Sequence, residues 1–141
     1  MHLLRQGIPM DALIDRILAE VRTVAVVGIS DKPDRPSHAV ARYLKERGYR
    51  IVPVNPALKE VLGETAYPSL SAVPGTIDLV DVFRKSADVP PVAEEAVRAG
   101  ARFFWMQEGV VNEEARERLE KAGIPVVMDL CVKKELQKRG R

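Results

Sequence analysis

The segment Val24-Ala25-Val26-Val27-Gly28-Ile29-Ser30 decides the fold of this chain. Its first four residues form a short, β-branched apolar run that is typical of a buried parallel strand. Gly28 then allows the backbone to turn sharply off the strand. In doubly wound α/β proteins, ligands bind beyond the carboxyl ends of such strands. The segment therefore predicts a parallel sheet and the opening of a nucleotide-binding pocket.

Outward from this segment, short apolar runs alternate with amphipathic stretches, which is the pattern of successive βαβ units. Strands are expected at 24–27, 50–54, 76–83, 101–105 and 125–128. Helices are expected at 10–21, 37–48, 88–100, 112–123 and 130–139, with a helical turn at 57–62 and a minor strand at 65–67. The predicted fold is a Rossmann-type, doubly wound, mostly parallel five-stranded α/β sheet with helices on both faces.

Individual residues refine the expected elements. Ser37, Asp88 and Asn112 stand where a side chain can cap the first turn of a helix. Pro53 lies inside the second strand and predicts a position near the strand end or the sheet edge, because proline cannot donate a ladder hydrogen bond. Trp105 is expected to pack in the core where the fourth strand ends.

Composition limits the classes of protein that the chain can belong to. Its 141 residues are 46% hydrophobic and 30% charged, which fits one globular domain over 1–141 with a core at 23–131. The net charge of only +2 argues against nucleic-acid binding. No apolar run reaches the roughly 20 residues of a membrane span, and no signal-peptide core is seen. A solvated, partly frayed helix end is expected for the basic tail at 133–141.

Few residues are candidates for catalysis. His2 lies near the start of the chain, and His38 is expected to be a half-exposed residue at a helix start. The single cysteine, Cys131, excludes an internal disulfide and favours a reducing, cytoplasmic location. Cys131 could be a thiolate at a helix N-terminus, but a small buried hydrophobe is the expected role. No metal-ligand spacing appears, so no catalytic or metal residue is predicted.

Two acidic residues, Asp78 and Asp81, fall within the predicted third strand. They are three positions apart, so their side chains are expected on opposite faces of the strand. Salt-bridge or capping roles are expected for both residues, rather than catalytic ones.

The loop after the first strand has the features of a phosphate site. Ser30 offers a hydroxyl, Lys32 and Arg35 offer positive charge, and the helix expected to begin at Ser37 has free N–H groups that favour an anion. These groups are close together in the sequence and follow a buried strand. They predict a pocket for a phosphate-bearing ligand.

The dinucleotide fingerprint is absent from the same loop. Asp31 and Asp34 stand where further glycines are expected, and carboxylates there would repel a pyrophosphate. The second strand ends in Asn55, which cannot accept hydrogen bonds from a ribose diol as a carboxylate does. An NAD(P)-binding oxidoreductase is therefore a minor alternative.

Six stretches, in this order and spacing, resemble the CoA-binding domain family, the module that also begins the succinyl-CoA synthetase α subunit. They are 24–30, 35–37, 48–56, 78–84, 105–109 and 126–131. The likeness runs from about Thr23 to Cys131 and is to the small stand-alone members of the family. The resemblance implies coenzyme A (CoA) as the ligand, which the strand ends alone cannot distinguish from another nucleotide.

The resemblance also implies which residues contact CoA. The loop after the first strand would hold its phosphates, and Phe83 and Arg84 would supply an adenine-side wall and a charge. The full implied set is Gly28, Ile29, Ser30, Asp31, Lys32, Arg35, Ser37, Asn55, Pro56, Lys59, Phe83, Arg84, Met106, Gln107 and Glu108.

The chain departs from the synthetase pattern in two respects. The synthetase has a glycine-rich loop where this chain has Asp31 and Asp34, and it needs a phosphorylated histidine in a second domain. This chain has no histidine after His38. The leading hypothesis is therefore a cytoplasmic protein that binds CoA or an acyl-CoA without catalysis of its own. The alternatives are an enzyme that acts on an acyl-CoA or uses Cys131, and a CoA-dependent interaction protein; self-association stays open.

Overall fold

A computed structural model describes residues 9–141. His2, one of the two histidines considered for catalysis, lies outside the described residues. The helices are α1 (Met10–Glu20), α2 (Pro36–Glu46), α3 (Val89–Ala99), α4 (Glu113–Lys121) and α5 (Val132–Lys138). The strands are β1 (Thr23–Val27), β2 (Arg50–Val54), β3 (Glu60–Val61), β4 (Glu64–Thr65), β5 (Leu79–Val82), β6 (Phe103–Met106) and β7 (Val126–Val127). Two 3₁₀ turns, η1 (Leu70–Ala72) and η2 (Ser86–Asp88), complete the order. Within residues 9–141 no helix is long and apolar enough to cross a membrane.

Five strands form one sheet in the order β2-β1-β5-β6-β7, and every pair in it is parallel. Counted along the chain, this is the order 2-1-3-4-5, one of the common doubly wound arrangements. The order reverses between β1 and β5, so the crevice beyond the carboxyl ends of these two strands is the expected ligand position. The predicted fold class is confirmed.

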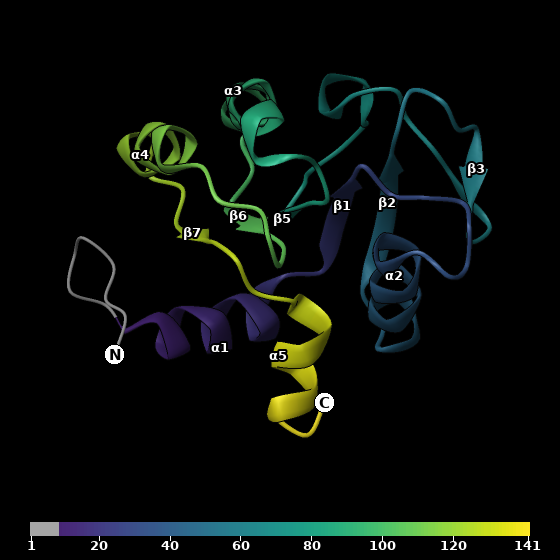
Figure 1. Cartoon of the computed structure of the whole chain (residues 1–141), viewed down its shortest axis with the longest axis horizontal. Coiled ribbons are helices and arrows are strands. Elements are labelled where there is room, and N and C mark those ends of the chain that lie inside the picture. The colour runs from purple at the N-terminus through teal and green to yellow at the C-terminus, as the bar shows by residue number, and fades with distance from the viewer. Residues whose placement is uncertain (1–8) are drawn as a thin grey trace.

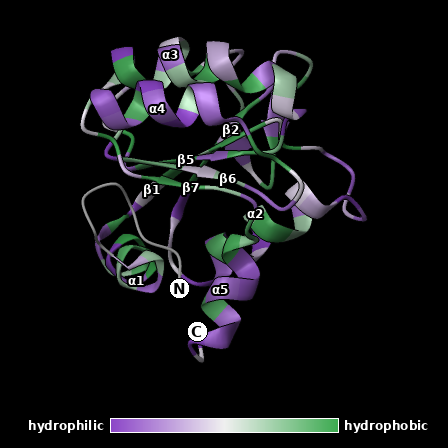
Figure 2. Ribbon diagram, turned by 60° about the vertical axis from the view of Figure 1, so that its left-hand side comes forward, coloured by the Kyte–Doolittle hydropathy of each residue, from purple (hydrophilic) through white to green (hydrophobic). Residues whose placement is uncertain are grey.

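Helices cover both faces of the sheet, as Figures 1 and 2 show. The helices α1, α2 and α5 pack on one face together with Val24 and Val26. The helices α3 and α4 pack on the other face together with Ala25 and Val27. Because alternate residues of β1 enter two different cores, the strand is apolar along its whole length, as a parallel central strand requires.

The segment after β2 differs from the expected helical turn at 57–62. It forms the antiparallel hairpin β3–β4, whose turn holds Leu62 and Gly63 at φ values of 55° and 75°. A hairpin turn of this kind needs left-handed residues, and the sequence Leu62-Gly63 supplies them. The backbone of Tyr67 exchanges hydrogen bonds with Pro53 and Asn55 and so covers the outer side of β2. The edge position predicted from Pro53 is confirmed.

The third main strand is shorter than predicted, because β5 begins at Leu79. Asp78 stands just before it and accepts hydrogen bonds from the backbone N–H groups of Arg22 and Thr23, at 2.9 and 3.0 Å. This carboxylate therefore caps the start of β1, and the capping role predicted for Asp78 is confirmed.

The prediction of a solvated basic tail is confirmed for Lys134, Lys138 and Arg141, which are exposed, but it is wrong for Arg139. Arg139 forms ion pairs with Asp11 and Asp15 of α1 and with Glu135. The side chain of Arg141 donates to the carbonyl of Leu18, also in α1. The end of the chain is therefore fastened to α1, because acidic residues of α1 face it.

Candidate functional site

A cavity of about 340 Å³ opens at the carboxyl ends of β1 and β5, where the strand order reverses. Most of its lining comes from the loop between β1 and α2, and one residue comes from the end of β5. The lining residues are Gly28, Ser30, Lys32, Arg35, Pro36, Ser37 and Phe83. Six of these seven belong to the set of CoA contacts expected from the sequence, and the structure brings them together.

Gly28 allows the loop to pass close to β5. Its φ is +86°, and a Cβ atom added to it would lie 2.2 Å from the carbonyl oxygen of Phe83. Its N–H donates to the carbonyl of Val54. A glycine is therefore required here both for the left-handed backbone and for the close approach of the two strand ends.

Hydrogen bonds from side chains of α2 and of Ser30 hold the shape of the loop between β1 and α2. The hydroxyl of Ser37 accepts a hydrogen bond from the N–H of Ser30 at 2.9 Å, and the Ser30 hydroxyl accepts one from the N–H of Lys32 at 3.1 Å. The Nδ1 atom of His38 lies 3.0 Å from the carbonyl oxygen of Ser30. Three hydrogen bonds thus hold the backbone around Ser30.

Two expectations for this loop are corrected. Ser37 does not cap α2, because the helix begins at Pro36 with Arg35 at the N-cap, and the Ser37 hydroxyl is engaged by Ser30. His38 is buried rather than half-exposed, with 7% of its surface accessible, because its ring folds back onto the Ser30 carbonyl. Both residues fix the loop conformation.

The charges around the cavity are basic. Lys32 and Arg35 line it, and neither forms an ion pair with any residue in the described part of the chain. The Cδ atom of Arg84 would lie 3.4 Å from a Cβ on Gly28, which places this side chain against the loop. Asp31 and Asp34 are exposed and do not line the cavity. Asp31, which the resemblance places among the CoA contacts, is therefore not among the residues that line this cavity, and neither is Asp34.

The residues expected after β2 support the loop from the side. The Asn55 amide donates to the carbonyl of Ile29 at 2.9 Å and accepts from the N–H of Ala57 at 2.9 Å. The side chain of Ile29 is fully buried in the core. Pro56 and Lys59 are exposed and do not line the cavity. Asn55 thus ties the end of β2 to the loop after β1.

The three residues expected at the end of β6 also lie outside the cavity lining. Met106 is fully buried in the core below α3 and α4. Glu108 is exposed, and both of its oxygens accept from Lys134 at 3.0 Å. Gln107 is buried, with 3% exposure, and its amide donates to Oδ1 of Asp81 at 2.7 Å.

Asp81 is the polar residue that the sequence interpretation assigned wrongly. It is fully buried in β5 and forms neither a salt bridge nor a cap among the described residues; its one side-chain hydrogen bond there is from the Gln107 amide. The Oδ2 atom has no hydrogen-bond partner there. Burial raises the pKa of this carboxyl to about 7, although the Gln107 hydrogen bond opposes the shift. The available signal was an acidic residue inside an otherwise apolar strand.

The remaining candidates for chemistry have structural positions. Cys131 is a free thiol that is 9% exposed and packs in the core, as expected for a small hydrophobe. Trp105 is fully buried, and its indole N–H donates to the carbonyl of Leu130 at 2.7 Å. Among the residues that the structure describes, no three His, Cys, Asp or Glu side chains are grouped to hold a metal ion.

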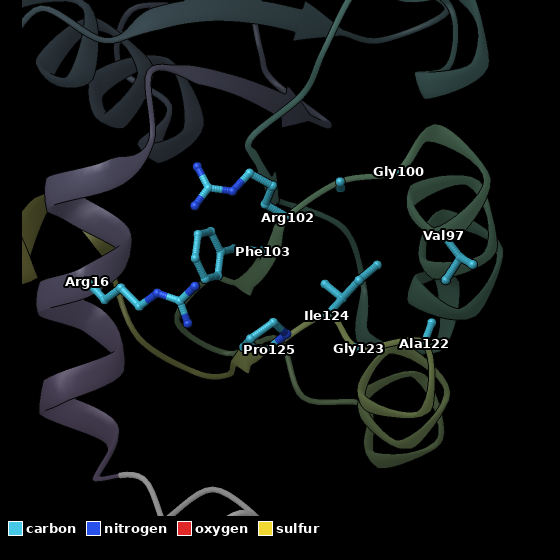
Figure 3. A pocket seen from close by; sticks show the side chains of 10 residues that line it. Arg16, Val97, Gly100, Arg102, Phe103, Ala122, Gly123, Ile124 and Pro125 are labelled. Carbon is cyan, nitrogen blue, oxygen red and sulfur yellow. The ribbon is translucent and has the colours of Figure 1, made fainter.

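A larger cavity, of about 440 Å³, lies at the opposite, amino-terminal edge of the sheet (Figure 3). Arg16 and Arg102 approach the ring of Phe103 there, each with its guanidinium carbon 5.2 Å from the ring centre. Both arginines also form ion pairs with Glu20. Arg102 also lies 4.0 Å from Oδ1 of Asp78, so both cations of this cavity have carboxylate partners, and the cavity lies away from the strand-order reversal. We therefore take the smaller cavity as the candidate site.

Comparisons with known proteins show what this chain is similar to. The uncharacterized protein YneT of Bacillus subtilis (strain 168) is 49% identical over 125 residues, which cover 89% of this chain and 93% of YneT. A solved structure of a hypothetical protein from Pyrococcus horikoshii OT3 superimposes with a TM-score of 0.89 at 36% identity, over 98% of both chains.

A larger relative carries a matching region. Acetate–CoA ligase [ADP-forming] I of Archaeoglobus fulgidus is 26% identical over 121 residues, which cover 79% of this chain but only 18% of the ligase. The family model for the CoA binding domain matches residues 22–137, from the start of β1 into α5. The match spans the whole sheet and the loop that lines the cavity. This chain therefore belongs to the CoA-binding domain family.

Proposed function

We propose that this chain binds CoA or an acyl-CoA at the carboxyl ends of β1 and β5. The observation that carries the proposal is the cavity beside Gly28, where Lys32 and Arg35 have no ionic partner among residues 9–141. Unpaired cations at a pocket favour an anionic ligand, and CoA bears several phosphate charges. The membership in the CoA-binding domain family supports CoA over other phosphate-bearing ligands.

The loop geometry supports the same assignment of the phosphates. The cavity lies at the start of α2, an 11-residue helix that begins at Pro36, which has no N–H. The N–H groups of Arg35 and His38 already donate to the carbonyls of Lys32 and Arg35, so the helix contributes the positive end of its dipole rather than a row of free donors. A helix N-terminus carries a partial positive charge and attracts phosphate groups. In this proposal the phosphates lie between the Ser30 loop and Arg35, and Arg84 approaches from β5.

The proposed role is binding without catalysis by this polypeptide. The acetate–CoA ligase relative is more than five times longer than the region it shares with this chain, since that region is 18% of its length. Cys131 is buried in the core, which disfavours the alternative in which its thiol performs chemistry. The one cysteine also supports a reducing, cytoplasmic location.

Isothermal titration tests the proposal. We expect CoA and acetyl-CoA to bind the purified protein with a Kd in the micromolar range or tighter, and NAD to bind much more weakly. Binding should weaken as salt concentration rises, because the contacts with phosphate are ionic. A protein that is folded by circular dichroism but gives no heat with either CoA form at high micromolar concentration would contradict the proposal.

A further inference from the structure

The buried carboxyl of Asp81 is not explained by the fold. A buried polar atom without a hydrogen-bond partner destabilises a protein, and native structures contain few of them. Oδ1 of Asp81 accepts from Gln107, but Oδ2 has no partner within the described residues. The indole N–H of its neighbour Trp105 is already donated to Leu130. An apolar residue would suit this position better if the carboxyl had only a structural role.

The strand register places Asp81 directly below the candidate site. Asp81 lies opposite Val26 on β1 and opposite Trp105 on β6. Phe83 follows two residues later, packs against the same core as Val26 and Trp105, and lines the cavity. Asp81 is therefore the next side chain below Phe83 on this face of the sheet.

Gln107 links the carboxyl to the end of β6. Its side chain reaches Asp81, its N–H donates to the carbonyl of Val82, and its carbonyl accepts from Val110. Both the backbone and the side chain of Gln107 are thus fixed. Asp81 and Gln107 form a buried, fixed polar pair, and Asp81 lies two residues before the cavity-lining Phe83.

We propose that Asp81 and Gln107 form a polar subsite below Phe83, which hydrogen-bonds an uncharged amide or amine group of the bound ligand. The ligand group reaches the subsite when the half-buried Phe83 side chain moves aside. A carboxyl fits such a group in either protonation state, because ionised Oδ2 accepts from an N–H and protonated Oδ2 donates to a carbonyl. A charged group does not fit, since burial of a charge costs far more than burial of an amide.

The inference rests on the proposed CoA binding and deepens it. CoA carries suitable groups in two places, the amides of its pantetheine arm and the amino group of its adenine. Adenosine 3′,5′-bisphosphate contains only the second, and pantetheine contains only the first. Titrations with CoA and with each half therefore identify which part of the ligand occupies the subsite.

The test compares the wild type with Asp81→Val, Asp81→Asn and a control, Asp88→Asn. Asp88 is an exposed carboxylate that makes no side-chain cap hydrogen bond. We expect Asp81→Val to weaken CoA binding at least about tenfold and to weaken the binding of only one of the two halves. Asp81→Asn should retain more affinity than Asp81→Val, because its amide still forms hydrogen bonds, and Asp88→Asn should behave as the wild type.

The contrary outcomes are distinct. If the wild type does not bind CoA, the proposed function fails and the subsite fails with it. If the wild type binds CoA but Asp81→Val binds it within about twofold of the wild type, or loses affinity equally for both halves, only the subsite is overturned. Should Asp81→Val not fold, the ¹³C resonance of the wild-type Asp81 carboxyl decides: a shift on addition of CoA supports the subsite, and an unchanged resonance in the CoA complex overturns it.

Discussion

The cations at the two ends of the strands differ in whether they form ion pairs. We call the amino-terminal ends of the strands the amino edge and their carboxyl ends the carboxyl edge. At the amino-terminal edge, Arg16 and Arg102 share Glu20, and each also lies near the ring of Phe103. At the carboxyl edge, Lys32 and Arg35 line a cavity without an ionic partner in residues 9–141. The larger of these two cavities therefore holds arginines that form ion pairs, and the smaller cavity holds cations that form none among residues 9–141.

In our proposal the functional cavity is the smaller of these two, so the absence of ion-pair partners within residues 9–141, and not volume, identifies it. The arginines at the amino-terminal ends already have carboxylate partners, whereas Lys32 and Arg35 are exposed cations that can pair with an anionic ligand. The buried Oδ2 atom of Asp81, which has no partner among the described residues, costs stability. The two cations lie in the loop between β1 and α2, and Asp81 lies in β5, two residues before the cavity-lining Phe83. The predictions below test whether the two edges respond differently to matched changes.

The largest effect is expected from Gly28→Ala. The added Cβ would overlap the Phe83 carbonyl, and the left-handed φ disfavours alanine, so unfolding free energy should fall by about 2–5 kcal/mol. The matched control at the amino edge is Gly123→Ala, where φ is +81° but no atom lies within 4 Å. The free energy of unfolding of this control should fall by only about 1 kcal/mol. Urea denaturation measures both, and equal losses would contradict the close-approach argument.

A comparably large effect is expected from Asp81→Asn, and it depends on pH. The folded-state pKa of Asp81 is about 7, above the ordinary value of 3.8. The folded state therefore binds the proton more tightly, and the stability that this provides is lost as pH rises from about 4 to about 7. Asp81→Asn has no carboxyl to ionise, so its free energy of unfolding should not fall in this way. Relative to the wild type, the variant should become more stable as pH rises, by up to about 2–4 kcal/mol above pH 7. Unfolding curves at several pH values check this, and a difference that does not vary with pH would refute the buried-carboxyl interpretation.

An intermediate effect is expected on ligand affinity from Arg35→Ala. Loss of a charge-assisted phosphate contact should weaken CoA binding about tenfold or more, and the salt dependence of the Kd should become shallower. Arg16→Ala at the amino edge removes the same charge from the other cavity and should leave the Kd unchanged. If Arg16→Ala weakened CoA binding as much as Arg35→Ala, the proposed position of the ligand at the carboxyl ends of the strands would be contradicted.

The smallest effect is expected from Arg102→Gln. Its ion pair with Glu20 is exposed, and such pairs contribute little in water. The pKa of Glu20 is held below its ordinary value mainly by Arg102, so the variant should raise that pKa. The unfolding temperature should fall slightly at low salt and should not differ from that of the wild type at high salt, because salt screens the ion pair. The affinity for CoA should be unchanged. A large decrease in the unfolding temperature would contradict the interpretation that Arg102 forms only a weak surface ion pair.

Strand and helix positions could be predicted because each depends on a local pattern. The valine run of β1 and the glycine after it located both the sheet and the loop that lines the cavity. Pro53 marked the edge strand, and Asn112 marked the start of α4, where its side chain accepts from the N–H of Ala115 at 2.9 Å. These features depend on residues that are close in sequence, so spacing alone reveals them.

Other features could not be predicted because they depend on residues that are distant in sequence. The Gln107 partner of Asp81 is 26 positions away, and its Oδ2 lacks a partner only in the packed fold. The role of Ser37 is set by Ser30, which lies across a turn rather than along the helix. The hairpin at β3–β4 depends on the left-handed backbone at Leu62, which is uncommon for a leucine.

The fastening of the chain end to α1 has a consequence for the order of folding. The pair between Arg139 and Asp15 joins residues that are 124 positions apart, and α1 and α5 contribute to the same apolar cluster. Contacts of such high sequence separation form late, because a long loop must close first. During synthesis, α1 emerges before α5 and lacks this neighbour until α5 has also left the ribosome. We therefore expect the α1 face of the sheet to be completed last, although its first helix is made first.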